Sequence, residues 1–355
     1  MLTIEVCARI DDRIKYDAPF LGHYSSNLLK STDSEGINRN VPNSQFEKWA
    51  INELGFRGPD ITHTKPEGIT RIVCMGTSET FGLYESPGKE WVSQLTDILG
   101  EPHRFQVINT SVVGLSLKQY NRYIEKYVLK IEPDIIILYI NPFGYAVGVD
   151  NFDKRQTEPP NNTNNDDKEW EFSVKHIISN LRMFPKIKQT IKGIIPMQTL
   201  KRYRLWNMKR QLRKLEHTHL NDKKPRDVVS KENLNTFRND LRKLIRFLCN
   251  QEIDVILVSY PALISPENIE KYSEVFLDHR RFYIDLSIAG ILDASYKFNN
   301  VIKTLAFEHG TGFVDIDSLI PKNIQYFADN VHYTNEGAEL VALHLSNYIK
   351  NKLFD

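Results

Sequence analysis

The chain has 355 residues, of which 41% are apolar, and its formal net charge is +1 at pH 7. The apolar content supports a sizeable core, and the nearly neutral charge argues against bulk binding of nucleic acid or of an acidic target. The three cysteines, Cys7, Cys74 and Cys249, are odd in number and widely spaced, which indicates neither a disulfide framework nor a zinc site.

The first 68 residues are mixed in character, with Ser, Asn, Asp and Gly concentrated between Ser25 and Asn43. This composition predicts a partly extended lead-in segment that packs on the core and is not a separate domain. For Arg57 in this segment, a surface or structural role is favoured over direct contact with a functional site.

Strands and helices alternate from residue 69 to residue 350. Short apolar runs predict strands at residues 71–76, 105–112, 135–141, 254–260 and 312–316. Apolar residues at helical spacing predict helices at about residues 89–99, 117–130, 234–250, 296–309 and 334–351. Such alternation implies right-handed crossovers and a parallel sheet, so we expect one α/β domain over residues 69–350.

Residues 151–230 form a long insertion in this alternation. The polar run at residues 161–167 is a plausible boundary. The stretch from Phe172 to Leu215 has twelve basic residues and no Asp or Glu, with aromatic and aliphatic residues interleaved. We expect either a basic lid that recruits an anionic or membrane-surface partner through residues 175–214, or a solvated helical face packed on the core.

Ser78 follows the first predicted strand, so its hydroxyl is expected at the carboxyl end of that strand, where open α/β sheets place their chemistry. A serine hydroxyl is a poor nucleophile until a histidine takes its proton, and the histidine needs a carboxylate to fix its tautomer. Asp329 and His332 lie three residues apart, so a single turn of chain could present both. These three residues are therefore candidates for a serine-hydrolase triad.

Gly114 follows the second predicted strand, and Asn141 ends the third. The Gly114 N–H and the Asn141 amide, together with the Ser78 N–H, would form an oxyanion hole. Each piece alone has a simpler interpretation, because Gly114 and Ser78 can be turn residues, Asn141 can end a strand, and Asp329 can cap a helix. Their joint occurrence in this order favours the catalytic interpretation.

The set Ser78, Gly114, Asn141 and His332, in that chain order, resembles the SGNH (GDSL-type) hydrolase superfamily over roughly residues 69–350. The resemblance implies a flavodoxin-like three-layer fold with a parallel sheet, to which this sequence adds the basic helical insertion. It also implies an acyl-ester hydrolase or acyltransferase site in which Ser78 is the nucleophile, His332 the base and Asp329 its orienting acid.

Two blocks depart from the pattern of that superfamily. Its Gly-Asp-Ser block reads Gly76-Thr77-Ser78 here, and its Gly-x-Asn-Asp block reads Tyr139-Ile140-Asn141-Pro142. Thr77 and Pro142 replace residues that are not among the four catalytic ones, so the departures concern the substrate more than the chemistry. The segment Asn52–Pro59 looks like the lead-in of a bacterial subgroup of these proteins.

Three functions remain open at this stage. The first is an esterase that removes an acyl group, most simply acetyl, from a saccharide or small molecule through an acyl-Ser78 intermediate. The second is an O-acyltransferase of surface-polysaccharide assembly, and the third is a catalytically idle binding protein. No cofactor or nucleic-acid partner is expected. No metal is expected either, since His217 and His219 lack a paired ligand motif and more simply face solvent.

The amino terminus lacks the basic start and apolar run of a signal peptide. No stretch reaches the ~18 apolar residues of a membrane-spanning helix. Together with the free cysteines, these features predict a cytoplasmic location.

Overall fold

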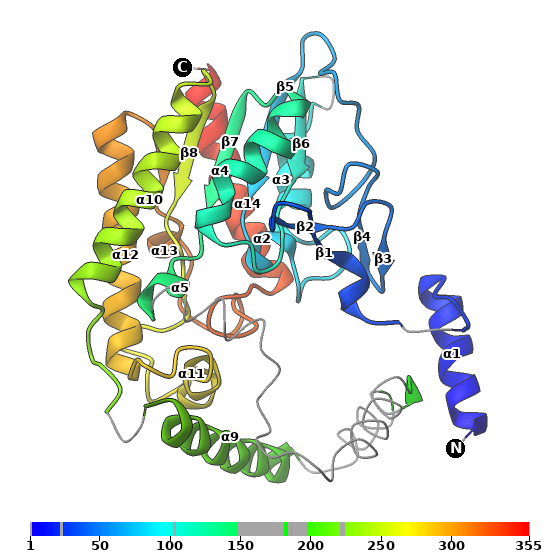
Figure 1. Cartoon of the computed structure of the whole chain (residues 1–355), viewed down its shortest axis with the longest axis vertical. Coiled ribbons are helices and arrows are strands. Elements are labelled where there is room, and N and C mark those ends of the chain that lie inside the picture. The colour runs from blue at the N-terminus through cyan, green and yellow to red at the C-terminus, as the bar shows by residue number, and fades with distance from the viewer. Residues whose placement is uncertain are drawn as a thin grey trace.

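The structure is a computed structural model that describes residues 2–21, 24–101, 104–147, 181–183, 186, 197–220 and 224–354 (Figure 1). The predicted polar boundary at residues 161–167 and most of the basic stretch before Met197 lie outside these residues. None of the helices in the described part of the chain is both long and apolar enough to cross a membrane.

A five-stranded parallel sheet forms the centre of the fold (Figure 1). Its strands are β5 (Thr70–Met75), β6 (Phe105–Asn109), β7 (Ile135–Tyr139), β8 (Asp254–Val258) and β9 (Gly312–Val314), and they lie in the spatial order β6-β5-β7-β8-β9. This order confirms the predicted α/β class with a flavodoxin-like parallel sheet. The order reverses between β5 and β7, and open α/β sheets bind their ligands at such a switch point.

Helices cover both faces of the sheet and complete the three layers. α3 (Trp91–Leu99) and α14 (Asn335–Phe354) pack on each other against one face. α4 (Leu117–Tyr123), α10 (Lys231–Cys249) and α12 (Ile288–His309) cover the other face (Figure 1). The apolar positions predicted for the last helix are all fully buried, namely Ala338, Val341, Ala342, Leu345 and Ile349.

Two further long helices, α1 (Leu2–Tyr16) and α9 (Met197–Leu220), lie outside these layers (Figure 1). The shorter helices are η1 (Ser26–Leu29), α2 (Ser78–Phe81), η2 (Ile124–Val128), η3 (Leu129–Ile131), α5 (Phe143–Ala146), α11 (Ser273–Arg280) and α13 (Ile316–Leu319). Two small antiparallel hairpins precede the main sheet, formed by β1 (Lys30–Thr32) with β2 (Asn38–Asn40) and by β3 (Gln45–Phe46) with β4 (Trp49–Ala50).

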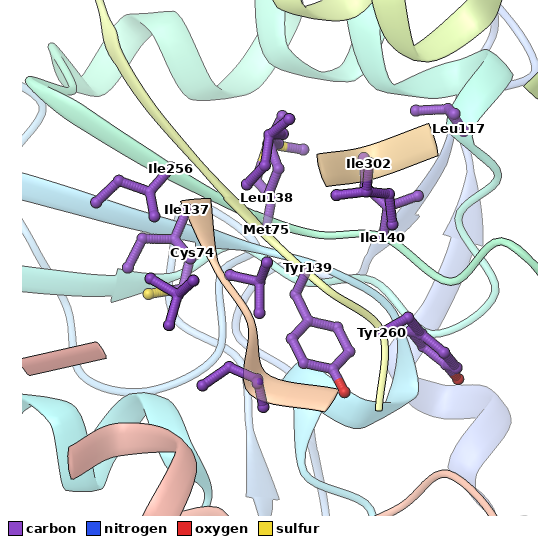
Figure 2. Close-up of a cluster of buried hydrophobic side chains, with 14 of the residues drawn as sticks. Cys74, Met75, Leu117, Ile137, Leu138, Tyr139, Ile140, Ile256, Tyr260 and Ile302 are labelled. Carbon is purple, nitrogen blue, oxygen red and sulfur yellow. The ribbon is translucent and has the colours of Figure 1, made fainter. Parts of the chain in front are cut away.

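The central strands are buried on both faces because helices cover the sheet from both sides. Every residue of β7 is buried, and only the first residue of β5 is partly exposed. Figure 2 shows this packing around Cys74 of β5, Ile137 of β7 and Ile256 of β8. Because such a core is close-packed, the carboxyl ends of these strands have fixed positions.

The structure differs from the sequence-based elements most at two helices. The first residues form helix α1 instead of a partly extended segment. α1 is held by contacts of Glu5 and Asp12 with Arg182, Met183 and Lys186, which no local pattern indicates. Helix α12 begins at Ile288, eight residues before the predicted start at Tyr296. It begins there because the Ser287 side chain accepts the N–H of Gly290 and caps the helix.

A buried arginine joins the lead-in to the sheet. Arg71 in β5 is fully buried, and its guanidinium donates to the backbone oxygens of Thr62, His63 and Ile131. Its Nε donates to Gln106 Oε1 of β6 at 2.8 Å. One side chain therefore holds three segments of chain at the amino end of the sheet.

We expect Arg71→Met to lower the free energy of unfolding by about 2–4 kcal/mol, because it removes the hydrogen bonds of a buried guanidinium and leaves the buried Ile131 oxygen without this donor. Urea denaturation followed by circular dichroism measures this loss. The exposed Lys130→Ala serves as the control and should change stability by less than about 0.5 kcal/mol. Equal stability of the two variants would show that Arg71 does not have this role.

Candidate active site

The site begins at the tight turn between β5 and the four-residue helix α2. A Cβ at Gly76 would lie only 2.0 Å from Thr80 Oγ1, so this turn needs glycine. Gly82 ends the helix with a φ of +76°, a left-handed conformation that favours glycine. These two glycines allow the chain to turn sharply enough to place Ser78 at the carboxyl end of β5.

Ser78 is hydrogen-bonded to His332, which in turn is hydrogen-bonded to Asp329. His332 Nε2 lies 2.9 Å from Ser78 Oγ, and His332 Nδ1 lies 2.7 Å from Asp329 Oδ2. The other Asp329 oxygen accepts the backbone N–H groups of Val331 and His332 at 2.8 and 2.9 Å. The structure thus brings the three predicted residues into one hydrogen-bonded chain, and their catalytic roles remain predictions.

The simpler interpretation of Asp329, as the cap of the last helix, is wrong. Helix α14 begins at Asn335, six residues after Asp329. Its first turn is capped by Thr334, whose Oγ1 accepts the N–H of Gly337 at 3.1 Å. Asp329 instead directs its side chain to the turn that carries His332.

The buried environment changes the protonation of this pair. Burial opposes the charged form of His332, but the hydrogen bond to Asp329 and the nearby negative charge of Glu79 outweigh it, so the pKa of His332 is raised above 6.5. Burial also opposes the Asp329 carboxylate, but the hydrogen bond from His332 and the backbone donors lower its pKa to about 2. An ionised carboxylate beside an imidazole that readily accepts a proton is the combination that a general base needs.

Gly114 and Asn141 line the same pocket as Ser78. Gly114 has a φ of +82°, so the turn after β6 also favours glycine. The Asn141 side-chain oxygen accepts the N–H of Phe143 at 3.0 Å, and its amide nitrogen donates to Glu79 Oε1 at 2.9 Å. The amide nitrogen carries a second hydrogen that is available to another acceptor. The role of these groups in binding an oxyanion remains a prediction.

The pocket in front of Ser78 has a volume of about 470 Å³, which is within the usual range for small-molecule sites. Its apolar wall comes from the loop after β6 and from the region of α11, and includes Val113, Leu115, Leu117, Val275 and Phe282. Its polar lining includes Tyr84, Asp278, His279 and Arg281. The pocket can therefore hold a ligand that has both apolar and polar parts.

Glu79, Tyr84 and the residues of α11 also belong to the site and were not predicted from the sequence. For Glu79, its position directly after Ser78 could have indicated that it lies at the site. The Tyr84 ring lies 5.1 Å from the His332 ring between centroids. Burial and the nearby Asp329 charge raise the pKa of Tyr84 to about 12. For α11 no signal existed, because only the folded chain brings it to the pocket.

Arg57 of the lead-in is buried behind the turn that carries Ser78, and lies neither at the surface nor in the pocket lining. Its guanidinium donates to the Gly82 oxygen at 3.1 Å and pairs with Glu90 at 3.2 Å. Its backbone N–H donates to the Asn109 oxygen at 3.0 Å. The role of Arg57 is therefore structural, because it connects the lead-in to the carboxyl ends of β5 and β6.

Helix α9 is the part of the basic insertion that the structure describes most fully. It packs on α11 through Leu212, which is 3% exposed, and through an ion pair of Glu216 with Arg280 at 2.6 Å. Gln211 accepts a hydrogen bond from Arg281 at 2.6 Å. Among its described side chains, none lines the pocket in front of Ser78. α9 thus supports the α11 wall from outside.

The described residues contain no cluster of three or more His, Cys, Asp and Glu side chains that could hold a metal ion. His217 is exposed on α9, and the side chain of His219 lies outside the described part of the chain.

The sequence matches the family model described as GDSL-like Lipase/Acylhydrolase over residues 72–345. No curated protein matches the chain. Among solved structures, the chain is similar to a lipase/acylhydrolase from Enterococcus faecalis, with 14% identity, a TM-score of 0.44, and coverage of 79% of this chain and 96% of that chain.

Two other solved structures show a similar degree of likeness. One is an acetyl xylan esterase from Geobacillus stearothermophilus, with 14% identity, a TM-score of 0.42, and coverage of 79% of this chain and 94% of that chain. The other is a member of the lipolytic protein G-D-S-L family from Veillonella parvula, with 14% identity, a TM-score of 0.41, and coverage of 79% and 97%. Likenesses at this level carry no argument about function.

We expect the His332 imidazole to titrate with a midpoint above pH 6.5, because its folded-state pKa is raised. Since the base must be neutral, kcat/KM should rise with pH through that midpoint and be lost below it. In Asp329→Asn the midpoint should move to lower pH, because the variant removes the negative charge that stabilises the imidazolium. Turnover should fall by about 10⁴-fold.

Nuclear magnetic resonance of ¹³C-labelled histidine measures the midpoint, with the His332 signal assigned by its loss in His332→Ala. Asp293→Asn on α12 is the control, and it should leave the midpoint unchanged. A His332 midpoint at or below 6.5 in the unsubstituted protein would contradict the expectation.

Proposed function

Since the chain belongs to the GDSL-like lipase/acylhydrolase family, we propose that it is a serine esterase that cleaves an acyl ester of a saccharide or small molecule. The observation that carries the proposal is the hydrogen-bonded chain of Ser78, His332 and Asp329, with distances of 2.9 and 2.7 Å. A strand-end serine activated in this way is suited to attack an ester carbonyl.

In the proposed reaction, Ser78 Oγ attacks the ester carbonyl carbon while His332 Nε2 takes the hydroxyl proton. The negative charge that develops on the carbonyl oxygen is stabilised by the N–H groups of Ser78 and Gly114 and by the Asn141 amide. The bond to the alcohol oxygen then breaks, and the alcohol leaves with the proton from His332. Water, activated by His332, attacks the acyl-Ser78 ester, so that an acid is released and the serine is restored.

The pocket supports a substrate with a small acyl group and a larger alcohol part. A volume of about 470 Å³ is far more than an acetyl group occupies, which leaves room for a ring. Asp278 and Arg281 in the lining offer an acceptor and donors for the hydroxyl groups of a saccharide. The same room would accept a sugar hydroxyl in place of water, which would make the protein an O-acyltransferase.

We expect a serine-directed fluorophosphonate to label the protein at one site, and Ser78→Ala to abolish the label, because Ser78 alone is paired with the base. Ester turnover by this variant should fall by about 10⁴- to 10⁶-fold. Intact-mass spectrometry and hydrolysis of p-nitrophenyl acetate measure the two effects. The exposed Ser318→Ala is the control and should keep both label and activity.

Label that persists on Ser78→Ala would contradict the assignment of the nucleophile. A panel of acetyl and longer acyl donors, with and without sugar acceptors, then separates the alternatives. Free acid as the product supports the hydrolase, and an acylated sugar supports the transferase. A protein that takes neither label nor substrate would be the catalytically idle binding protein.

We also propose that the outer face of α9 attracts an anionic partner. Arg210 and Lys214 are exposed there, and Lys209 and Arg213 are exposed beside the hollow between α9 and α11. Arg210 lies over the ring of the half-exposed Trp206 at 5.5 Å. This face is the described part of the predicted basic patch at residues 175–214. The nature of the partner, including a membrane surface, and the cytoplasmic location of the chain remain predictions from the sequence.

If α9 gathers an anionic partner, reversing Lys209, Arg210 and Lys214 to Glu should raise KM for an anionic substrate or weaken binding to anionic vesicles. kcat for a small neutral ester should stay unchanged, since an exposed patch acts on encounter and binding. Added salt should bring the wild type towards the variant, because the screening length is about 8 Å at physiological ionic strength.

The matched control reverses three exposed lysines on other helices, Lys130, Lys231 and Lys303. If the α9 variant and this control have the same KM, the same vesicle binding and the same salt dependence, α9 is only a solvated helical face that packs on α11.

A further inference from the structure

Glu79, directly after Ser78, is a buried acid at the centre of a hydrogen-bond network under the pocket. Its side chain is 1% exposed. Oε1 accepts hydrogen bonds from the Asn141 amide at 2.9 Å and from the Tyr260 hydroxyl, and Oε2 accepts one from the Thr77 hydroxyl. A buried acid is costly unless donors satisfy it, and here three donors converge on one carboxylate.

These bonds determine how the Asn141 side chain is oriented. The terminal torsion of an asparagine is broad and nearly two-fold, so an amide without fixed partners can rotate or flip. In this site the Asn141 oxygen is held by the Phe143 N–H, and one amide hydrogen is held by Glu79. Because the amide group is planar, these two bonds also fix the position of the second amide hydrogen. Tyr283 is close enough to hydrogen-bond the same side chain.

The network also reaches the turn that carries the histidine. Tyr139 OH lies 2.8 Å from Tyr333 OH, and Tyr333 directly follows His332. The Tyr139 and Tyr260 rings pack edge to face at 5.6 Å, so the tyrosine that donates to Glu79 lies against the one that holds Tyr333 (Figure 2). Fully buried tyrosines of this kind rigidify a polar network whose members are all satisfied.

We propose that Glu79 is a positioning residue that holds the Asn141 amide so that its other N–H can donate to the developing oxyanion. This inference rests on the proposed esterase function, and adds to it a residue that acts through Asn141. Glu79 and Ser78 are consecutive residues of α2. One turn of chain therefore positions both the nucleophile and the Asn141 amide that would donate to the oxyanion.

The test compares three replacements of Glu79 that separate the position of its acceptor oxygens from its charge. Glu79→Gln keeps an acceptor oxygen at the same distance from Asn141 and removes the charge. Glu79→Asp keeps the charge but withdraws the oxygens by one methylene, and Glu79→Leu removes both. If Glu79 positions Asn141, kcat of Glu79→Gln should stay within about fivefold of wild type, and kcat of Glu79→Asp and Glu79→Leu should fall about 10- to 100-fold. KM should change little in all three. Asn141→Ala should lower kcat by about 10²- to 10³-fold.

Double variants test whether Glu79 acts through Asn141. If it does, Glu79→Leu combined with Asn141→Ala should be no more than about threefold slower than Asn141→Ala alone. Thr80→Val is the matched control, a change of the next buried side chain of α2 that is not bonded to Asn141, and it should keep kcat near wild type. The proposal would be overturned if the two losses of kcat multiply in the double variant, or if Glu79→Asp has a higher kcat than Glu79→Gln. If Glu79→Leu does not fold, the ranking of Gln and Asp decides.

A measurement without substrate separates this proposal from the proposed function. The side-chain NH₂ signals of Asn141, assigned by their loss in Asn141→Ala, should shift in Glu79→Asp and stay in place in Thr80→Val. Unchanged signals in Glu79→Asp would overturn the positioning role even if the enzyme is active. If wild type shows no Ser78-dependent ester cleavage, the proposed function fails, while these signals still show whether Glu79 holds Asn141.

Discussion

The parallel pairing of β5 with β7 is the constraint on which the candidate site depends. The two strands run in register from Ile72 opposite Ile135 to Met75 opposite Leu138, so their carboxyl ends lie side by side. Ser78 follows β5, and Asn141 follows β7. After β5 the chain crosses to β6 on one side of this strand pair, and after β7 it crosses to β8 on the other side. A pocket lies between the two departing chains, and Asn141, Asp329 and His332 all line it.

The electrostatics of the site follow from burying several acids around one histidine. Glu79, Glu85 and Asp329 all act on His332, and together with the hydrogen bond to Asp329 they outweigh the burial that opposes its protonation. Glu85 is itself so buried that its pKa is raised to about 7, whereas Asp329 is lowered to about 2 by its donors. Hydrogen bonding, more than exposure, therefore sets the pKa of Asp329 apart from that of Glu85.

The α11 wall of the pocket comes from different segments than the hydrogen-bonded residues Ser78, His332 and Asp329. Ser78 lies at the end of β5, and Asp329 and His332 lie in the loop before α14. The facing pocket wall comes from α11, which α9 supports from outside through Arg280 and Arg281. Changes in α9 and α11 can alter the pocket without disturbing the sheet. Such a separation would let the proposed mechanism act on different esters.

The sequence alone determined the α/β class, the five central strands and the candidate residues Ser78, Gly114, Asn141, Asp329 and His332. This was possible because apolar runs give strands directly, and because each of these residues is marked by its position at a strand end or before the last helix. Only the tertiary structure decided that Asp329 serves the His332 turn and not a helix cap, that Arg57 is buried, and that α11 forms the pocket wall. The same holds for the three donors that converge on Glu79, since Thr77, Asn141 and Tyr260 come from three separate strand ends. Local sequence patterns record the propensities and periodicity of one segment, whereas these features depend on packing between distant segments, such as Glu79 and Tyr260, which are 181 residues apart along the chain.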